Sequence, residues 1–268
     1  MASTHQEFAG KVVFIAGGSS GINLGIAKGF AEQGAKVAIA SRSQERIDGA
    51  VAELKKLGGE VRGYSADVRD AAAIAAVLKQ AHDDLGDFDV LVSGAAGNFV
   101  APALGMSANG FKTVIDIDLN GTFHVLRAAH EFLKKPGASI INISAPQAIN
   151  PMPYQAHVCA AKAGVDMLTK VLAMEWGPEG IRVNSIIPGP IADTEGMRRL
   201  APGDAAIKAV AASVPLRRLG KASEIADMAI FLSSDRAAYV TGAIVPVDGG
   251  SALGGGANLA GAAAASGK

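Results

Sequence analysis

Lys162 is the residue of this chain whose type and place most directly suggest chemistry. It stands just before an apolar periodic pattern that predicts a helix over Ala163–Glu175. A lysine ammonium can hold hydroxyl groups or support a nearby acid. A tyrosine four residues before it would lie one helical turn away and could protonate a carbonyl oxygen. That position holds Val158, so the chain lacks a phenol where reduction of an ordinary ketone would use one.

A glycine-rich turn near the N-terminus predicts a site for phosphate groups. A buried strand is expected over Lys11–Ala16, and the residues Gly17-Gly18-Ser19-Ser20-Gly21-Ile22 follow it and open a predicted helix. Glycine lets a backbone approach a pyrophosphate closely, and the helix offers free N–H groups and a positive dipole end. Because the turn joins a strand to a helix, we predict a dinucleotide site; a plain strand–helix turn is the alternative.

The end of the second strand indicates which dinucleotide binds. A carboxylate there would hold the ribose 2′-hydroxyl of NAD. The chain instead has Ser41-Arg42-Ser43, with Arg46 one turn later, and hydroxyl and guanidinium groups suit a 2′-phosphate. We therefore predict NADPH, the alternative being that Arg42 is a solvated surface cation.

The residues that follow the third predicted strand are expected to meet the adenine ring. Asp67 and Val68 are expected to flank the adenine ring, with Asp67 accepting a hydrogen bond from its amino group. Asp70 stands just before the next helical pattern, and we expect its side chain to cap that helix.

These residues are predicted to be positioned by alternating strands and helices. Short Val- and Ile-rich runs predict buried strands, and longer periodic patterns between them predict helices. Strict alternation predicts an α/β fold, a single-domain doubly wound parallel sheet of the Rossmann type with helices on both faces. The predicted strands are Lys11–Ala16, Lys36–Ala40, Val61–Ser65, Val90–Val92, Ser139–Ile143, Arg182–Ile187 and Ile244–Val247, and the predicted helices are Ile22–Gln33, Gln44–Lys56, Ala71–Leu85, Phe111–Lys134, Ala163–Glu175 and Ser223–Leu232.

The domain is expected to span residues 1–253. Within it, residues 194–214 are predicted to form a helical substrate lid, because they lie between the sixth strand and the last helix. Residues 254–268 are rich in Gly and Ala and predict a mobile tail.

Composition excludes several classes of protein. Lys and Arg number 25, as do Asp and Glu, so no basic surface is expected for nucleic acid or an anionic membrane. A single cysteine, Cys159, excludes an internal disulfide. We find no spanning apolar run and no signal-type segment, and expect a cytoplasmic protein without a metal site.

The turn at Gly17–Ile22, with Ala95-Ala96-Gly97, Lys162 and Pro188-Gly189-Pro190-Ile191, resembles the short-chain dehydrogenase/reductase family over about residues 8–252. Within it, the chain is most similar to the peroxisomal-type 2,4-dienoyl-CoA reductase branch. The segments that carry this closer resemblance are Ala95-Ala96-Gly97-Asn98-Phe99, Phe111 through Asp118, Gln155-Ala156-His157, Glu175-Trp176-Gly177-Pro178 and Pro188 through Arg199.

Several positions depart from the pattern of the wider family. Besides Val158 at the tyrosine position, Ala145 stands at the serine position, with Ser144 beside it. Asn23 occupies the place of a third glycine, and Ser93-Gly94 stands where the family often has Asn-Asn. Both hydroxyl donors of the usual carbonyl reductase are thus absent.

The resemblance implies NADPH-dependent reduction of a 2,4-dienoyl-CoA, in which hydride adds to the far end of the conjugated system and a carbon is then protonated. In that branch an aspartate and the lysine activate a water, and the matching residues are Asp118 and Lys162. Asn120 matches an asparagine that orients water or the thioester oxygen. The alternative for Asp118 is a partly exposed helix carboxylate, since Asp116 stands nearby.

The resemblance also implies the remaining contacts. Pro188, Gly189, Ile191 and Thr194 would close over the nicotinamide and pyrophosphate, together with Ala95 and Ala96. Phe99 would line the acyl pocket, with Asn98, Ser107 and Asn109 in the substrate site, and Arg42, Arg69 and Arg199 would meet CoA phosphates; scattered surface arginines are the alternative. The family resemblance implies a homo-oligomer, usually a tetramer.

Two other functions stay open at this stage. A carbonyl reductase of the 3-oxoacyl thioester type could use Tyr154, eight residues before the lysine, or a water as its acid. His157 could titrate near neutrality or be a structural histidine. The second alternative is a non-catalytic sensor that binds a dinucleotide. Asn23 and Ser93-Gly94, which depart from the family pattern, favour it.

Overall fold

The computed structural model describes residues 6–253 of the chain. Its centre is a seven-stranded sheet in the order β3-β2-β1-β4-β5-β6-β7, in which every strand runs parallel to its neighbours. The strands are β1 Val12–Ala16, β2 Lys36–Ser41, β3 Val61–Ser65, β4 Val90–Ser93, β5 Ser139–Ile143, β6 Arg182–Pro188 and β7 Ile244–Val247. All seven predicted strands are confirmed to within one residue at either end.

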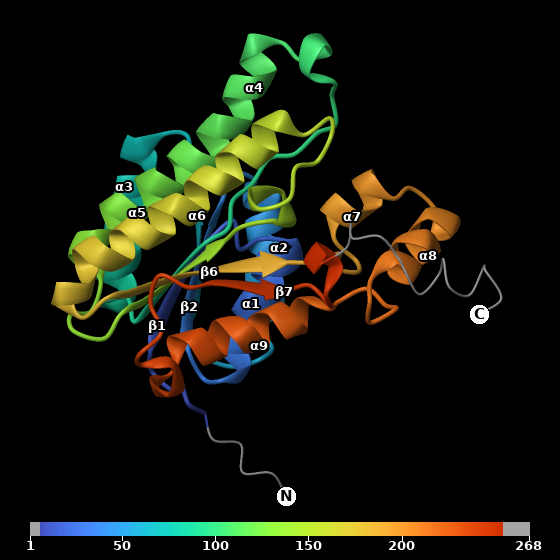
Figure 1. Cartoon of the computed structure of the whole chain (residues 1–268). Helices are drawn as coiled ribbons and strands as arrows, with labels where there is room; N and C mark the ends of the chain where they lie inside the picture. Colours follow the sequence, from blue (N-terminus) through green and yellow to red (C-terminus); the bar gives the residue numbers. More distant parts are fainter. Residues whose placement is uncertain (1–5, 254–268) are drawn as a thin grey trace, which may run out of the picture.

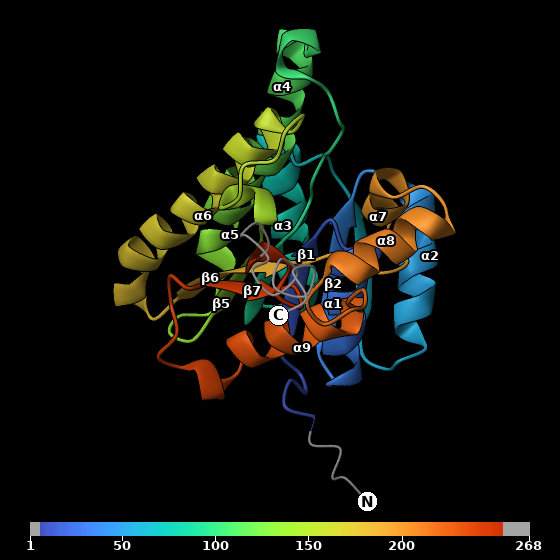
Figure 2. The same ribbon diagram turned by 45° about the vertical axis from the view of Figure 1, so that its right-hand side comes forward.

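Helices cover both faces of the sheet. They are α1 Gly21–Glu32, α2 Gln44–Lys55, α3 Ala71–Leu85, α4 Ala108–Ile115, α5 Gly121–Ala129, α6 Ala156–Trp176, α7 Glu195–Leu200, α8 Asp204–Ser213 and α9 Ala222–Ser233. Figure 1 and Figure 2 show α3, α5 and α6 on one face and α1, α2 and α9 on the other. The predicted single-domain, doubly wound Rossmann-type architecture is therefore confirmed.

Each face of the sheet has its own apolar core. Alternate strand residues point to opposite faces, so Phe14 and Leu91 pack under α3, α5 and α6, whereas Ile15 and Val92 pack under α1 and α9. Because both faces are covered, all five residues of β1 and of β5 are buried, and they are apolar apart from Ser139 and Asn142 of β5.

The order of the strands fixes where a ligand can bind. The chain builds outward from β1 to β3 and then crosses to β4 on the other side of β1, so β1 and β4 are neighbours whose connections run in opposite directions. Ala16 at the end of β1 pairs with Ala40 of β2 and with Ser93 of β4. The three strands thus end level with one another, and ligands of such sheets bind in the crevice outside this edge.

Two predicted helices differ from those observed. The helix predicted over Phe111–Lys134 is interrupted: α4 begins at Ala108, a π-helical turn spans Asp116–Asn120, and α5 ends at Ala129. The helix predicted to begin at Ala163 begins seven residues earlier, at Ala156. No proline or glycine lies between Ala156 and Lys162, so nothing in that stretch prevents the backbone from continuing as a helix. Lys162 is therefore two turns inside α6 and does not open it.

The segment predicted as a helical lid does contain two helices, α7 and α8, which lie beyond the carboxyl ends of β6 and β7 (Figure 1). Its role as a lid stays a prediction. The predicted mobile tail, residues 254–268, falls outside the described residues. Within residues 6–253, no helix has both the length and the apolar character needed to cross a membrane.

Candidate active site

A buried ion pair joins Asp118 to Lys162. The Lys162 Nζ lies 3.4 Å from the Asp118 Oδ2 and donates a hydrogen bond of 3.0 Å to the carbonyl oxygen of Ile143. The Asp118 Oδ1 accepts a 2.6 Å hydrogen bond from the backbone N–H of Gly97. Only 6% of the lysine side chain and 1% of the aspartate side chain are exposed. Each charge makes burial of the other tolerable, and the pair can hold and deliver a proton. Asp118 is thus not the partly exposed helix carboxylate of the alternative interpretation.

The π-helical turn sets the direction of the Asp118 side chain. Its wider turn holds one residue more than an α-helical turn, and such turns occur often at functional sites. The carbonyl oxygen of Asp118 accepts a 2.7 Å hydrogen bond from the hydroxyl of Thr122. The Asp118 carboxylate points toward Lys162 in the interior. The sequence contains no signal that predicts the π-helical turn.

Asn120 faces away from the ion pair, and the role toward water or the thioester oxygen that the resemblance implies for it stays a prediction. It is exposed, and its Nδ2 donates a 3.0 Å hydrogen bond to Asp116 Oδ1. Residues two apart on a helix project to nearly opposite sides, so Asp118 and Asn120 cannot both face the interior. Asp116 also accepts from Lys112, and these three residues form a surface network.

The positions that carry hydroxyls in ordinary carbonyl reductases hold no hydroxyl here. Val158 is 2% exposed and packs in a small apolar cluster with Val114 and Ala161. Tyr154 lies in the loop before α6, with 59% of its surface exposed and a left-handed φ of 66°. Its backbone oxygen accepts from the N–H of Ala101. Val158 therefore closes the usual place of the acid with hydrocarbon.

A second buried carboxyl, Asp166, lies one helical turn after Lys162 on the same face of α6. Asp166 is 7% exposed and its Oδ1 accepts a 3.1 Å hydrogen bond from the hydroxyl of Ser185. Burial raises the pKa of Asp166 above its usual value, although Ser144, Ser185 and Lys162 act in the opposite direction. Sequence reasoning missed this residue; the four-residue spacing to Lys162 was the available signal.

Buried polar side chains line the loop before α6. The Gln147 Nε2 donates to Gln155 Oε1 at 2.6 Å, and the Gln155 Nε2 donates to Asn98 Oδ1 at 3.3 Å. His157 is fully buried, and its ring lies 4.2 Å from that of Phe99, centroid to centroid. Burial lowers the pKa of His157, with nearby Asp118 opposing the shift. The predicted substrate residues Asn98 and Phe99 thus belong to a network that reaches α6 and sits beside the ion pair.

The glycine turn after β1 has the shape that a dinucleotide cradle requires. Gly17 has a φ of 83°, and a Cβ there would lie 2.9 Å from the backbone nitrogen of Ala95. A Cβ on Gly18 would lie 2.7 Å from the side chain of Ile39. Across the turn, a Cβ on Gly21 would reach the methyl group of Thr194 at 3.9 Å. Three predicted cofactor segments therefore converge, and the missing side chains leave the backbone N–H groups at the start of α1 accessible to phosphate.

The predicted 2′-phosphate residues also lie close to the turn. The Ser19 hydroxyl donates to the Ser41 hydroxyl at 2.8 Å, which joins the turn to the end of β2. Ser43 instead caps α2, accepting from the N–H of Arg46. Arg42 and Arg46 are exposed, and the Arg46 guanidinium pairs with Glu195 of α7 at 3.5 Å. This edge of the site therefore carries cations that a phosphate can reach.

The residues after β3 make a compact acidic corner. Arg69 donates to both oxygens of Asp67, and this contact lowers the pKa of the carboxyl. Val68 is buried against Gly121, where a Cβ would lie 2.6 Å from it. Asp70 accepts from the N–H groups of Ala72 and Ala73, which confirms the predicted cap of α3. Arg69 is thus paired with Asp67 on the surface, and its role toward a CoA phosphate stays a prediction.

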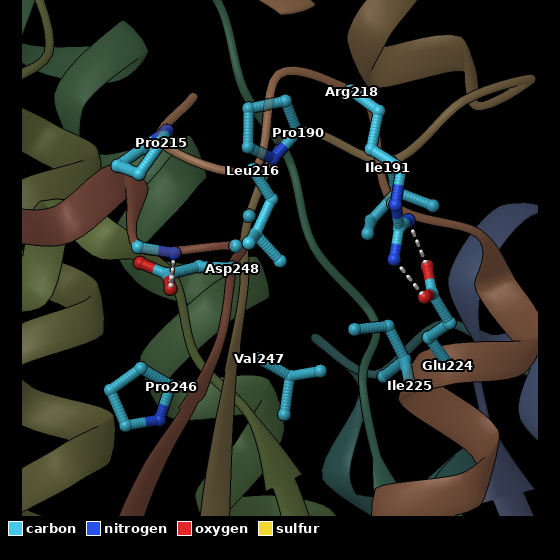
Figure 3. Close-up of a pocket in the computed structure, with 14 residues that line it drawn as sticks. Pro190, Ile191, Pro215, Leu216, Arg218, Glu224, Ile225, Pro246, Val247 and Asp248 are labelled. Carbon is cyan, nitrogen blue, oxygen red and sulfur yellow. Dashed lines mark hydrogen bonds and ion pairs between the residues drawn. The ribbon is translucent and has the colours of Figure 1, made fainter. Parts of the chain in front are cut away.

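The loop from Pro188 to Ile191 borders a cavity of about 530 Å³ on the side of α9 and β7. Pro190 and Leu216 line it on one side, and Arg218 pairs there with Glu224 (Figure 3). Neither Asp118 nor Lys162 borders this cavity. The Ile191 side chain is 3% exposed and packs on Gly220. If Ile191 contacts a carboxamide, its backbone atoms must therefore make the contact.

The other predicted substrate residues lie on exposed segments. Ser107 caps α4 by accepting from the N–H of Gly110 at 3.0 Å, and Asn109 stands beside it, exposed, in the first turn. Arg199 of α7 pairs with Glu195, the same carboxylate that holds Arg46. Thr194 caps α7 by accepting from the N–H of Met197 and donates to the carbonyl of Ile191. Arg69 and Arg199 therefore each pair with a surface carboxylate, and their predicted contacts with CoA phosphates stay a prediction.

Comparison with known proteins places the fold and the buried pair in context. A family model described as "Enoyl-(Acyl carrier protein) reductase" matches residues 16–252. A peroxisomal 2,4-dienoyl-CoA reductase of Pongo abelii, described as (3E)-enoyl-CoA-producing, is 46% identical over 91% of this chain and 84% of its own length. The chain belongs to the short-chain dehydrogenase/reductase family. It is an oxidoreductase of that family, which uses nicotinamide dinucleotides, and its resemblance to the dienoyl-CoA reductase branch is confirmed.

Two bacterial proteins extend the comparison of this short-chain reductase. A probable 2,4-dienoyl-CoA reductase of Bacillus subtilis, described as (2E)-enoyl-CoA-producing, is 42% identical over 90% of this chain and 96% of the relative. The crystal structure of a short-chain dehydrogenase from Bacillus anthracis matches with a TM-score of 0.81 and 41% identity, over 90% of this chain and 96% of that one. The relatives thus include both peroxisomal and bacterial proteins, and their names include both double-bond products.

Proposed function

We propose that this short-chain reductase uses NADPH to reduce a 2,4-dienoyl-CoA to an enoyl-CoA. The observation that carries the proposal is the buried Asp118–Lys162 pair, which replaces the missing phenol with a carboxylate and an ammonium 3.4 Å apart. The similarity to dienoyl-CoA reductases from animal and bacterial sources supports the same substrate class.

The chemistry divides into a hydride transfer and a proton transfer. Bound nicotinamide supplies the hydride, which adds to the far carbon of the diene while the π electrons move toward the thioester and form a dienolate. A proton then adds to a carbon of the dienolate, so one C–H bond forms in each step and one double bond is lost. Because the acceptor of the proton is carbon, a phenol at the thioester oxygen is not required, which fits Val158.

The residues of this chain have separate tasks in the second step. Lys162 holds its charge beside Asp118 and stabilises negative charge that develops on the substrate. Asp118 positions a water through its Oδ2, which has no hydrogen-bond donor among the described residues, while the Gly97 N–H fixes its other oxygen. The water delivers the proton to carbon and the pair supplies the replacement.

The residues after β2, at the border of the phosphate-binding turn, support a preference for NADPH. Ser41, Arg42 and Arg46 present hydroxyl and guanidinium groups, and no carboxylate stands at the end of β2, where a 2′-hydroxyl would bind one. The carboxylates nearest to this edge, Asp67 and Glu195, are each occupied by an arginine. A dianionic phosphate is therefore better matched than a neutral hydroxyl.

Turnover with two thioesters tests the function. The purified protein is mixed with NADPH and either 2,4-hexadienoyl-CoA or acetoacetyl-CoA, and oxidation of NADPH is followed by absorbance. We expect turnover with the dienoyl ester only, and NMR of the product then shows whether the double bond is at carbon 2 or carbon 3. Turnover with the oxo ester alone would contradict the proposal and point to Tyr154 as the acid, and binding of NADPH without any turnover would favour a sensor.

A further inference from the structure

Asn23 joins the two loops that face the predicted dinucleotide. It lies in the first turn of α1 and is 8% exposed. Its Nδ2 donates a hydrogen bond of 2.8 Å to the carbonyl oxygen of Gly94 and a longer one of 3.4 Å to that of Gly17. Gly17 follows β1 and Gly94 follows β4. One amide therefore spans the point where the neighbouring strands β1 and β4 end.

The position of the Asn23 amide explains why residue 94 is a glycine, whereas the backbone conformation of residue 94 does not require one. Gly94 does not have a left-handed φ, so its backbone accommodates an ordinary residue. A Cβ built on Gly94, however, would lie 2.2 Å from the Oδ1 and 2.5 Å from the Nδ2 of Asn23. A side chain at position 94 would therefore displace the Asn23 amide from its hydrogen bonds, and glycine leaves that amide in place.

The segment that begins at Gly94 ends at the catalytic carboxylate. Three residues after Gly94, the N–H of Gly97 donates to Asp118 Oδ1. The Gly94–Gly97 segment is thus held by the Asn23 amide at one end and by Asp118 at the other. Ala95, which lies within it, also forms the wall against Gly17. Movement of Gly94 would shift the cradle wall and the hydrogen bond to Asp118 together.

We propose that Asn23 and Gly94 are a matched pair, and that Asn23 is a positioning residue for the nicotinamide half of the bound dinucleotide. The two departures from the family pattern, an asparagine at position 23 and a glycine at position 94, are then one feature, because the Asn23 amide fills the volume that a side chain at position 94 would need. The proposal rests on dinucleotide binding and not on the acyl substrate.

Binding of two probes separates positioning from general stability. Dissociation constants are measured by calorimetry for NADPH and for adenosine 2′,5′-bisphosphate, which carries only the adenine half. Asn23→Ala loses its contacts with the Gly94–Gly97 segment, so NADPH binding should weaken roughly five- to tenfold, while binding of the bisphosphate stays within about twofold of the parent protein. Equal weakening of both probes would show that Asn23 is merely structural and would overturn the proposal, as would unchanged binding of NADPH.

A control variant and an exchange variant complete the test. Asn184 is a buried asparagine of β6 whose Nδ2 donates at 2.9 Å to the carbonyl of Val240, in the segment before β7. Asn184→Ala should lower the melting temperature and leave both dissociation constants unchanged. Gly94→Asn alone should be damaging because of the clash, and the double variant Asn23→Gly with Gly94→Asn should restore NADPH binding to within about threefold of the parent.

The outcomes stay separate from those of the proposed function, because no acyl-CoA is present. If the double variant binds NADPH no better than the weaker single variant, the matched-pair proposal is wrong. If the protein binds NADH and not NADPH, the same titrations are made with NADH and with adenosine monophosphate as the half-probe. Binding of neither dinucleotide by the parent protein would also refute the proposal.

Discussion

Removing the charge of Lys162 should destabilise the protein as well as inactivate it. Two unit charges 3.4 Å apart attract by about 5 kcal/mol at an effective dielectric constant of about 20. Lys162→Met leaves the Asp118 carboxylate with the N–H of Gly97 as its one remaining partner among those described. Loss of one member of a buried pair costs about 3–5 kcal/mol. At about 2–4 °C per kcal/mol for a domain of this size, the melting temperature should fall by roughly 6–20 °C.

Thermal unfolding of four proteins tests this reasoning. Lys170 lies on the exposed face of the same helix, so Lys170→Met is the matched control and should shift the melting temperature by less than about 2 °C. The double variant Asp118→Asn with Lys162→Met removes both charges and keeps an acceptor for Gly97. It should recover at least half of the loss, because the unpaired charge is gone. If the losses in melting temperature of the two single variants simply add in the double variant, the argument that each charge offsets the cost of burying the other is refuted.

Activity provides an independent measurement of the same pair. Asp118→Asn keeps the shape of the side chain but cannot take part in replacing the proton that the water delivers, so kcat with 2,4-hexadienoyl-CoA should fall by about 10²- to 10⁴-fold. NADPH should still bind, because Asp118 is not part of the phosphate turn. A kcat within about threefold of the parent protein would remove Asp118 from the mechanism.

Other changes test the remaining parts of the site. Arg42→Ala should weaken NADPH binding by about tenfold to a hundredfold and leave NADH binding unchanged, measured by calorimetry. Tyr154→Phe should leave kcat with the dienoyl ester within about twofold, and a loss above tenfold would restore Tyr154 as the acid. Because burial lowers the pKa of His157 below 6.5, the free energy of unfolding should decrease as pH falls from 6.5 through the lower folded value, by up to about 1.4 kcal/mol per pH unit; His157→Phe should flatten this slope in denaturant titrations. Because burial raises the pKa of Asp166, stability should decrease as pH rises from 3.8 through the raised folded value, and Asp166→Asn should melt higher than the parent at pH 7.

The strands and the phosphate turn could be predicted because their signals are local. A strand covered on both faces is mostly apolar: β1 is apolar along its whole length, and β5 is apolar except for Ser139 and Asn142. The glycines of the turn are required by the conformation of Gly17 and by the closeness of Ile39 to Gly18. Such requirements act on single positions, so they leave a mark in the residue types themselves.

The features that could not be predicted depend on contacts between distant segments. Gln155 precedes α6 without a capping hydrogen bond from its side chain, so the helix start left no sequence signal. The expected closeness of Asp118 and Lys162 is observed. The outward direction of Asn120 could not be predicted, because the π turn and the direction of each side chain cannot be read from the sequence. Asn23 and Gly94 are 71 residues apart, and each was an isolated anomaly until the fold brought them together.

The π-helical turn at Asp116–Asn120 has a consequence for how such a site can change over generations. Loss of one residue from that turn would restore regular α-helical geometry and rotate everything on one side of it by about 100° relative to the other. Either Asp118 would leave Lys162, or the buried stripe of α5, which includes Val125 and Leu126, would leave the core. A lineage cannot therefore reorient the carboxylate gradually by shortening or lengthening this helix. The proton-handling group and the apolar face that anchors its helix are inherited as one unit.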